Sequence, residues 1–149
     1  MNVLFVCTGN TCRSALAEGI ARAEADRREI LNFTVSSAGT NAWDGSPASD
    51  GALLVGMERG VDLGSHKSRR LTRDMVAAAD LVLVMAPNHV EAVRQLGGGG
   101  KIHLLDEYAS DGKSSNGIED PFGGDLEGYR GTYDRLQSAI SAMFDRLAR

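Results

Sequence analysis

Short apolar runs recur along the chain and indicate strands. Residues 3–6 form an apolar run that ends at Gly9-Asn10, and residues 81–85 form the clearest run of the same kind. Residues 33–37, which end before Gly39, and the apolar run 102–105 are predicted to be the other two strands. Continuous apolar runs of this length, bounded by turn residues, are typical of strands that are buried on both faces. The pattern therefore predicts four buried strands.

Helical spacing of apolar residues fills the intervals between these runs. In the second predicted helix, Leu53 and Met57 are expected to face the core. Residues 106–124 are polar and glycine-rich, which predicts a long loop. The predicted helices cover residues 14–28, a segment from an N-cap at Ser46-Pro47 to about Gly60, a short turn capped by Thr72, residues 87–96, and residues 126–147 with Asp125 as the N-cap.

Alternation of strands and helices decides the fold class. It predicts an α/β protein, a three-layer doubly wound sheet of four parallel strands with helices on both faces. No linker or repeat interrupts the pattern, so residues 1–149 are expected to form a single domain. In such sheets ligands bind beyond the carboxyl ends of the strands, and Cys7 lies at the carboxyl end of the first strand.

Composition and charge narrow the class further. The 149 residues are 42 % hydrophobic and 24 % charged, and they contain no apolar stretch long enough for a membrane span. The net charge of −4 and the pI of about 5.3 argue against nucleic acid as a partner, and nothing indicates a membrane. The N-terminus lacks a basic leader, so a cytoplasmic protein is expected. Only two cysteines are present, without metal-ligand spacing, and neither a metal nor an organic cofactor is required.

The turn after the first strand carries the candidate chemistry. Gly9 permits backbone conformations closed to other residues, and Asn10 tolerates left-handed geometry. Successive amides in such a turn, together with the start of a helix, form a site for an anion. Arg13 can bind two phosphate oxygens at once through its planar guanidinium. The segment reads Cys7-Thr8-Gly9-Asn10-Thr11-Cys12-Arg13-Ser14.

The loop amides, the start of the helix and Arg13 would also favour ionisation of the Cys7 thiol. Ser14 can donate its hydroxyl hydrogen to the thiolate, which would attack phosphorus and give a phosphocysteine that water later cleaves. Loop amides and Arg13 would meet the charge of the transition state. The competing interpretation is a buried Cys7 that packs as a small apolar residue, with Arg13 on the surface.

On these residues the sequence resembles the low-molecular-weight protein tyrosine phosphatase family. The resemblance spans essentially the whole chain and includes residues 36–40, residues 65–69 and Asp120-Pro121. It implies that Cys7 is the nucleophile, Arg13 the phosphate clamp and Asp120 the general acid. It also assigns Asn10, Ser14, Ser36 and His66 to bracing the loop. Ala15 departs from the family, which usually has proline there, and we expect only a modest effect on stability.

Two branches of the family differ in the phosphorylated side chain that they accept. Thr11, together with Asp120-Pro121-Phe122-Gly123-Gly124, is similar to the bacterial protein-arginine-phosphatase branch. A hydroxyl and a carboxylate suit a guanidinium, whereas aromatic and aliphatic walls suit a phosphotyrosine ring. Phosphoarginine is placed slightly ahead of phosphotyrosine. An exposed Trp43 would favour aryl phosphates, and core packing of Trp43 is the equal alternative.

Other interpretations have less support. An arsenate reductase of this fold needs further cysteines, and none follows Cys12. A non-catalytic phosphoprotein-binding module would be expected to lose Cys7 or Asp120. A reversible Cys7–Cys12 disulfide stays open beside a spectator role for Cys12, and His89 and His103 have no motif around them. The expected partners are phosphorylated proteins, with inorganic phosphate or sulfate in the loop formed by Cys7, Thr8, Gly9, Asn10, Thr11, Cys12 and Ser14, and with Trp43 and Phe122 beside the substrate.

Overall fold

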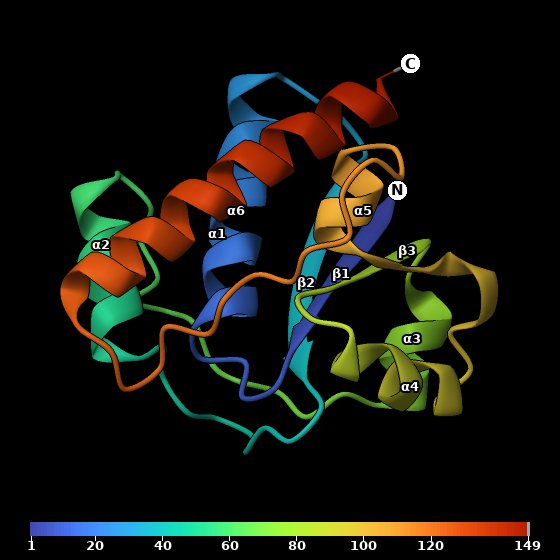
Figure 1. Ribbon diagram of the computed structural model, residues 1–149, viewed down its shortest axis with the longest axis horizontal. Coiled ribbons are helices and arrows are strands. Elements are labelled where there is room, and N and C mark those ends of the chain that lie inside the picture. The colour runs from blue at the N-terminus through green and yellow to red at the C-terminus, as the bar shows by residue number, and fades with distance from the viewer. Residues whose placement is uncertain (149) are drawn as a thin grey trace.

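A single parallel sheet organises the protein in the computed structural model, which describes residues 1–148 (Figure 1). The strand order is β2-β1-β3-β4, and all neighbouring pairs are parallel. The predicted α/β class and doubly wound sheet are confirmed. The strands are β1 (Asn2–Cys7), β2 (Thr34–Gly39), β3 (Leu81–Val84) and β4 (Ile102–Leu104).

Helices cover both faces of this sheet. The larger core lies between the sheet and α1, α2, α5 and α6, and a smaller core lies under α3 and α4 (Figure 1). Among the described helices, none combines the length and the apolar character needed to cross a bilayer. The helices are α1 (Arg13–Arg27), α2 (Asp50–Glu58), α3 (Arg73–Ala78), α4 (Asn88–Gln95), α5 (Leu105–Ala109) and α6 (Leu126–Leu147), with a short 3₁₀ turn at Gly99–Lys101.

Alternation along β1 divides its side chains between the two cores. Val3 and Phe5 point into the larger core, while Leu4 and Val6 point into the smaller one. Both sets are buried, as expected for a central strand with helices on each face. The strand is therefore fixed in register, and so is the turn that follows Cys7.

The second helix differs from the prediction. Ser49, rather than Ser46-Pro47, is the N-cap of α2, and its hydroxyl accepts the Ala52 amide. Met57 is 75 % exposed instead of inward-facing. The inner face of α2 consists of small residues because it packs closely: a Cβ added at Gly51 would lie 2.4 Å from the ring of Tyr129.

The segment after β4 also differs from the prediction. The first part of the loop predicted over residues 106–124 belongs to the helix α5. A helix of five residues is too short for apolar periodicity to reveal. The rest of the segment returns to the sheet, where the Ile118 amide donates to the Met85 carbonyl at 2.7 Å and the Ile118 side chain is buried. This anchor brings Asp120 to the edge of the sheet where Cys7 lies.

The end of β2 supports the turn after β1 through the backbone. The amides of Thr40 and Asn41 donate to the carbonyls of Cys7 and Thr8, both at 2.9 Å. Gly39 lies so close that an added Cβ would be 2.4 Å from the Thr8 carbonyl oxygen. Only glycine fits between β2 and the turn.

We predict that Gly39→Ala destabilises the protein by roughly 1–3 kcal/mol, because the backbone of the turn or of β2 has to move. Urea unfolding measures the change in free energy. Gly100→Ala is the matched control, since an added Cβ there meets nothing within 4 Å. Equal stability of the two variants would contradict this account of Gly39.

Candidate active site

A hollow of about 220 Å³ lies at the carboxyl end of β1. Its walls come from the turn between β1 and α1 and from the segment before α6, which approach each other in Figure 1. The structure therefore brings together the loop from Cys7 to Ser14 and the segment around Asp120, the two stretches for which the sequence predicted catalytic residues. The lining residues are Cys7, Thr8, Gly9, Thr11, Cys12, Arg13, Asp120 and Phe122.

The Cys7 sulfur lies within hydrogen-bond distance of two groups of the loop. Its Sγ atom lies 2.9 Å from Ser14 Oγ and accepts the Asn10 amide at 3.3 Å. Ser14 Oγ already accepts a hydrogen from the Asn10 side chain at 2.7 Å, so its own hydrogen is free to point at the sulfur. Both groups can donate a hydrogen to the sulfur. The alternative of a Cys7 that only packs in the core does not account for its place in the wall of the hollow.

Asn10 holds the loop in shape. It is fully buried and adopts a left-handed backbone conformation with φ of 57°. Its side-chain oxygen accepts the Arg69 amide at 2.9 Å, and its carbonyl accepts the His66 Nε2 hydrogen at 2.7 Å. His66 and Asn10 thus lie where a bracing role requires them.

The serine of β2 that contacts the loop is Ser37, and the expectation for Ser36 is wrong in this respect. The Asn10 side-chain amide lies 2.9 Å from Ser37 Oγ, and Ser37 donates in turn to Glu18 at 2.6 Å. Adjacent residues of a strand point to opposite faces, so only one of the two serines can reach Asn10. Strand alternation was the signal that could have separated them.

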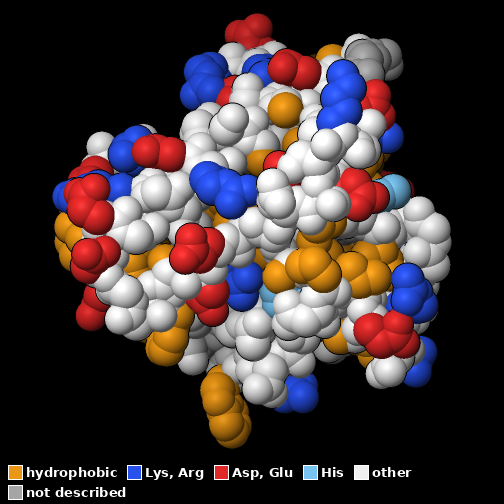
Figure 2. All heavy atoms as spheres, in the orientation of Figure 1, with side chains coloured by type: hydrophobic (Ala, Val, Ile, Leu, Met, Phe, Trp, Pro, Cys, Tyr) orange, Lys and Arg blue, Asp and Glu red, His pale blue; other side chains and the backbone are white. Residues whose placement is uncertain are grey.

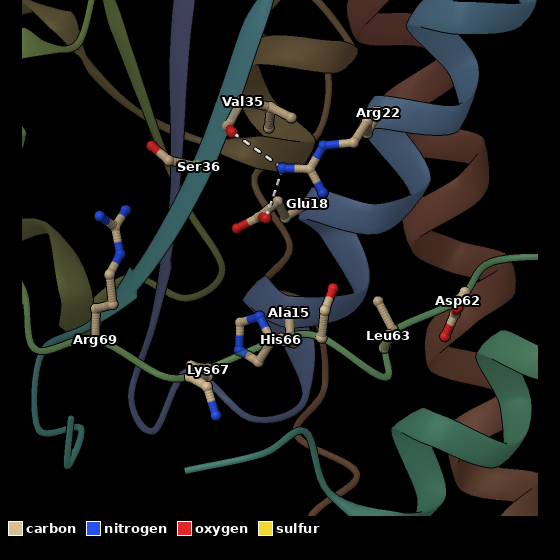
Figure 3. Close-up of a pocket in the computed structure, with 11 residues that line it drawn as sticks. Ala15, Glu18, Arg22, Val35, Ser36, Asp62, Leu63, His66, Lys67 and Arg69 are labelled. Atoms are coloured by element: carbon tan, nitrogen blue, oxygen red, sulfur yellow. Dashed lines mark hydrogen bonds and ion pairs between the residues drawn. The ribbon is translucent and has the colours of Figure 1, made fainter. Parts of the chain in front are cut away.

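Ser36 instead lines a second hollow of about 450 Å³, which shares no residue with the first. Figure 3 shows its walls: Ser36 on β2, Glu18 and Arg22 on α1, and His66 and Arg69 from the segment between α2 and α3. His66 and Arg69 also contact Asn10, so this hollow lies behind the loop that carries Cys7.

Arg13 and Asp120 face each other across the hollow. The Arg13 side chain is buried, donates to the Ile118 carbonyl at 3.2 Å, and lies 3.6 Å from the Asp120 carboxylate. The Asp120 side chain is 52 % exposed. The Phe122 amide donates to the same carboxyl group at 3.0 Å and fixes its direction. A cation and a carboxylate therefore lie close together in the lining that also contains Cys7.

Cys12 lies in a small polar cluster that sequence analysis did not identify. Its sulfur is 3.2 Å from Ser49 Oγ and 3.5 Å from the Tyr129 hydroxyl. Burial raises the pKa of Tyr129, which stays protonated. Both cysteines carry free thiols. The Ser49 amide also donates to the Thr11 carbonyl at 2.9 Å, so α2 supports the loop through this cluster. The disulfide hypothesis stays a hypothesis.

His89 also contacts the loop, although no motif in the sequence predicted it. It is 1 % exposed, and its Nε2 atom lies 2.9 Å from the Thr8 hydroxyl. His89 lies in the first turn of α4, the helix after β3, and the carboxyl end of β3 lies beside that of β1. Since ligands bind at this edge of a parallel sheet, the topology was the signal that could have identified His89.

Two aromatic side chains, Phe122 and Trp43, are largely exposed. Phe122 lines the hollow and is 72 % exposed, and Trp43 is 84 % exposed. Core packing, the alternative for Trp43, is therefore wrong. Trp43 is not among the residues that line the hollow, and its carbonyl accepts a hydrogen bond from Ser68.

The surface around the site offers no single sign of charge. Figure 2 shows Lys and Arg interspersed with Asp and Glu on this face of the molecule. Positive potential for an anion therefore has to come from Arg13 and the loop amides. Within residues 1–148, no group of three or more His, Cys, Asp or Glu side chains could hold a metal ion.

Comparison with known proteins agrees with this geometry. The sequence profile of the family described as low molecular weight phosphotyrosine protein phosphatase matches residues 2–149. A protein-arginine-phosphatase of Bacillus subtilis (strain 168) is 36 % identical and covers 99 % of this chain and 97 % of its own length. The low molecular weight protein-tyrosine-phosphatase PtpB of Staphylococcus haemolyticus is also 36 % identical, over 96 % of this chain and 97 % of its own.

A solved structure is equally similar. A mutant of the YwlE arginine phosphatase with a phosphorylated active-site serine superimposes with a TM-score of 0.94 at 35 % identity, covering 100 % of this chain and 97 % of the other. The profile, the relatives and the shared fold all point to one family, as the loop from Cys7 to Ser14 does. The chain belongs to the low molecular weight phosphotyrosine protein phosphatase family and is a cysteine-dependent phosphatase.

Proposed function

We propose that Cys7 attacks the phosphorus of a phosphorylated protein side chain and forms a phosphocysteine. One observation carries this role: the sulfur lies in the wall of the hollow and accepts hydrogen bonds from Ser14 and the Asn10 amide. These bonds stabilise the thiolate, which is the nucleophilic form. The S–P bond forms as the bond from phosphorus to the leaving atom breaks, and water later cleaves the S–P bond to release phosphate.

Arg13 binds the phosphoryl group during both steps. Its guanidinium is buried and anchored by the Ile118 carbonyl, so little side-chain freedom is lost on binding. Two parallel N–H donors match two phosphoryl oxygens. Substrate phosphate or free inorganic phosphate would then share the same cation, which makes inorganic phosphate a competitive inhibitor.

Asp120 acts first as an acid and then as a base. Its carboxyl group lies at the open side of the hollow, where the leaving atom of a substrate bound to Cys7 would be. It protonates that atom in the first step and takes a proton from water in the second. The Phe122 amide directs the carboxyl group in both.

Phosphoarginine is the substrate that the walls of the hollow suit best. Thr11 and Asp120 place a hydroxyl and a carboxylate where guanidinium N–H groups need acceptors, and Phe122 is the single aromatic side chain in the lining. The Bacillus subtilis relative supports the same choice. Phosphotyrosine is the second candidate, because exposed Trp43 and Phe122 offer aromatic surface and the PtpB relative is equally similar.

The partners under this proposal are phosphorylated proteins, and the compartment is the cytoplasm. Both thiols are free, and Cys7 has to stay reduced to act, which suits a reducing compartment.

We expect Cys7→Ser to lower the hydrolysis of p-nitrophenyl phosphate at least ~1000-fold, since a hydroxyl is not ionised at neutral pH. Steady-state rates across substrate concentrations measure the loss. His103→Asn is the control, because His103 lies in β4 and does not line the hollow. Comparable rates for wild type and Cys7→Ser would rule the nucleophile out.

Asp120→Ala should slow the first step by about 100- to 10,000-fold on a phosphoarginine peptide and by less on p-nitrophenyl phosphate, whose leaving group needs little protonation. Single-turnover kinetics on both substrates give the two factors. Glu119→Ala, one residue away, is the matched control and should keep its rates. An equal loss on both substrates would show that Asp120 is not the acid.

Thr11→Ile should shift the ratio of kcat/KM for phosphoarginine over phosphotyrosine peptides by about 10-fold or more toward tyrosine, because a hydrogen-bond acceptor is replaced by an aliphatic wall. Parallel kinetics on two peptides of one sequence measure the ratio. Thr11→Ser keeps the hydroxyl and should keep the preference. An unchanged ratio in Thr11→Ile would refute the assignment to phosphoarginine.

A further inference from the structure

The buried His89 and the exposed Thr8 form a partly buried contact at the edge of the hollow. His89 Nε2 lies 2.9 Å from Thr8 Oγ1, while its other ring nitrogen, Nδ1, accepts the Ala86 amide at 3.1 Å. Thr8 follows Cys7 directly and lines the same hollow. None of the roles assigned above to Cys7, Arg13 and Asp120 uses this contact.

The Ala86 amide determines which way the hydrogens point. A backbone N–H only donates, so Nδ1 has to carry a lone pair, and the neutral ring then carries its hydrogen on Nε2. Nε2 therefore donates to Thr8 Oγ1. Because Thr8 accepts from His89, its own hydroxyl hydrogen is directed elsewhere. Within residues 1–148 the histidine is its one side-chain partner by hydrogen bonding.

The ring stays neutral over the working range of pH. Burial, and after it the nearby charge of Arg13, lower the pKa of His89 to about 4, against a smaller opposing effect of Asp120. Above pH 5 the ring is therefore mostly uncharged. The direction of the hydrogen bond to Thr8 does not change as the pH varies between 5 and 8.

We propose that the Thr8 hydroxyl donates a hydrogen bond to the phosphoryl group bound above Cys7, and that His89 is the positioning residue that directs this donor. The proposal rests on phosphoryl transfer at Cys7 and is independent of the choice between phosphoarginine and phosphotyrosine. A donor fixed in advance stabilises developing negative charge without reorganising during the reaction. The phosphoryl group then has a third kind of hydrogen-bond donor, the Thr8 hydroxyl, besides the loop amides and Arg13.

Two substitutions at position 89 separate this role from a structural one. Asparagine carries an amide oxygen where histidine carries Nδ1, so His89→Asn keeps an acceptor for the Ala86 amide and removes the donor to Thr8. Glutamine carries an amide nitrogen near the place of Nε2, so His89→Gln keeps the donor and gives up the acceptor. At position 8, Thr8→Val removes the hydroxyl with little change of shape, and Thr8→Ser keeps it.

We expect Thr8→Val and His89→Asn each to lower kcat/KM about 10-fold and to weaken inhibition by inorganic phosphate by a similar factor, as for a lost hydrogen bond to a charged group. Thr8→Ser and His89→Gln should stay within about threefold of wild type. The double variant Thr8→Val/His89→Asn should lose no more than either single variant, because both remove the same bond.

If His89 only supports the structure, the activities of the two variants at position 89 should follow the opposite order. Such a role would leave His89→Asn active, impair His89→Gln, and make activity follow the unfolding midpoint in urea. That outcome, or kcat/KM within twofold of wild type in Thr8→Val, would overturn the proposal. If His89→Asn does not fold, the comparison of Thr8→Val with Thr8→Ser decides. Inactive wild-type protein would instead refute the phosphatase assignment.

A spectroscopic measurement checks the direction of the bond. Nitrogen chemical shifts of His89 in NMR spectra should identify a neutral ring with the hydrogen on Nε2 from pH 5 to 8. His103 is the matched control, since it lies in β4 and stacks on Tyr108 away from the loop, and His103→Asn should keep its activity. A hydrogen on Nδ1 of His89 would contradict the proposal.

Discussion

Burial of the Asn10 side chain is the constraint on which the catalytic loop depends. The residue is fully buried in a left-handed conformation, and each polar atom of its amide has a partner. An unpaired amide in this position would cost roughly 1–3 kcal/mol per lost contact, so the loop closes only when the surrounding segments are in place. Those segments are distant in sequence: Ser37 is 27 residues away, His66 is 56 and Arg69 is 59.

Under the proposed function, formation of the sheet is therefore what prepares Cys7 as the nucleophile. β2 has to pair with β1 before Ser37 can meet Asn10, and Asn10 has to be fixed before it can donate to Ser14. With its lone pair used in this way, Ser14 presents its hydrogen to Cys7. The sulfur is thus stabilised by a chain of contacts that starts in the fold, although the residues nearest to it are contiguous in sequence.

The division between contiguous and distant contacts also explains what the sequence could predict. The turn from Cys7 to Ser14 was identified because its chemistry lies within eight adjacent residues, and β1 and β3 were identified because buried strands are almost uniformly apolar. The choice of Ser37 over Ser36 and the role of His89 depend on which way a side chain faces and on which strand ends are neighbours. α5 was not predicted because five residues carry too little apolar periodicity. The start and the inward face of α2 were predicted wrongly because its inner face contains small residues such as Gly51.

Buried and exposed residues have different roles in the site. Asn10 and His89 hold the loop from two sides, Asn10 through β2 and His89 from the start of α4, and both have their polar atoms paired before any substrate arrives. Such paired, buried groups resist change, because altering one leaves another without a partner. Phe122 is 72 % exposed by comparison, and replacing its side chain leaves no buried polar group unpaired. Under the proposed function, the geometry of the loop that carries Cys7 is therefore fixed by buried residues, while the aromatic side chain beside the substrate can change without unfolding the loop.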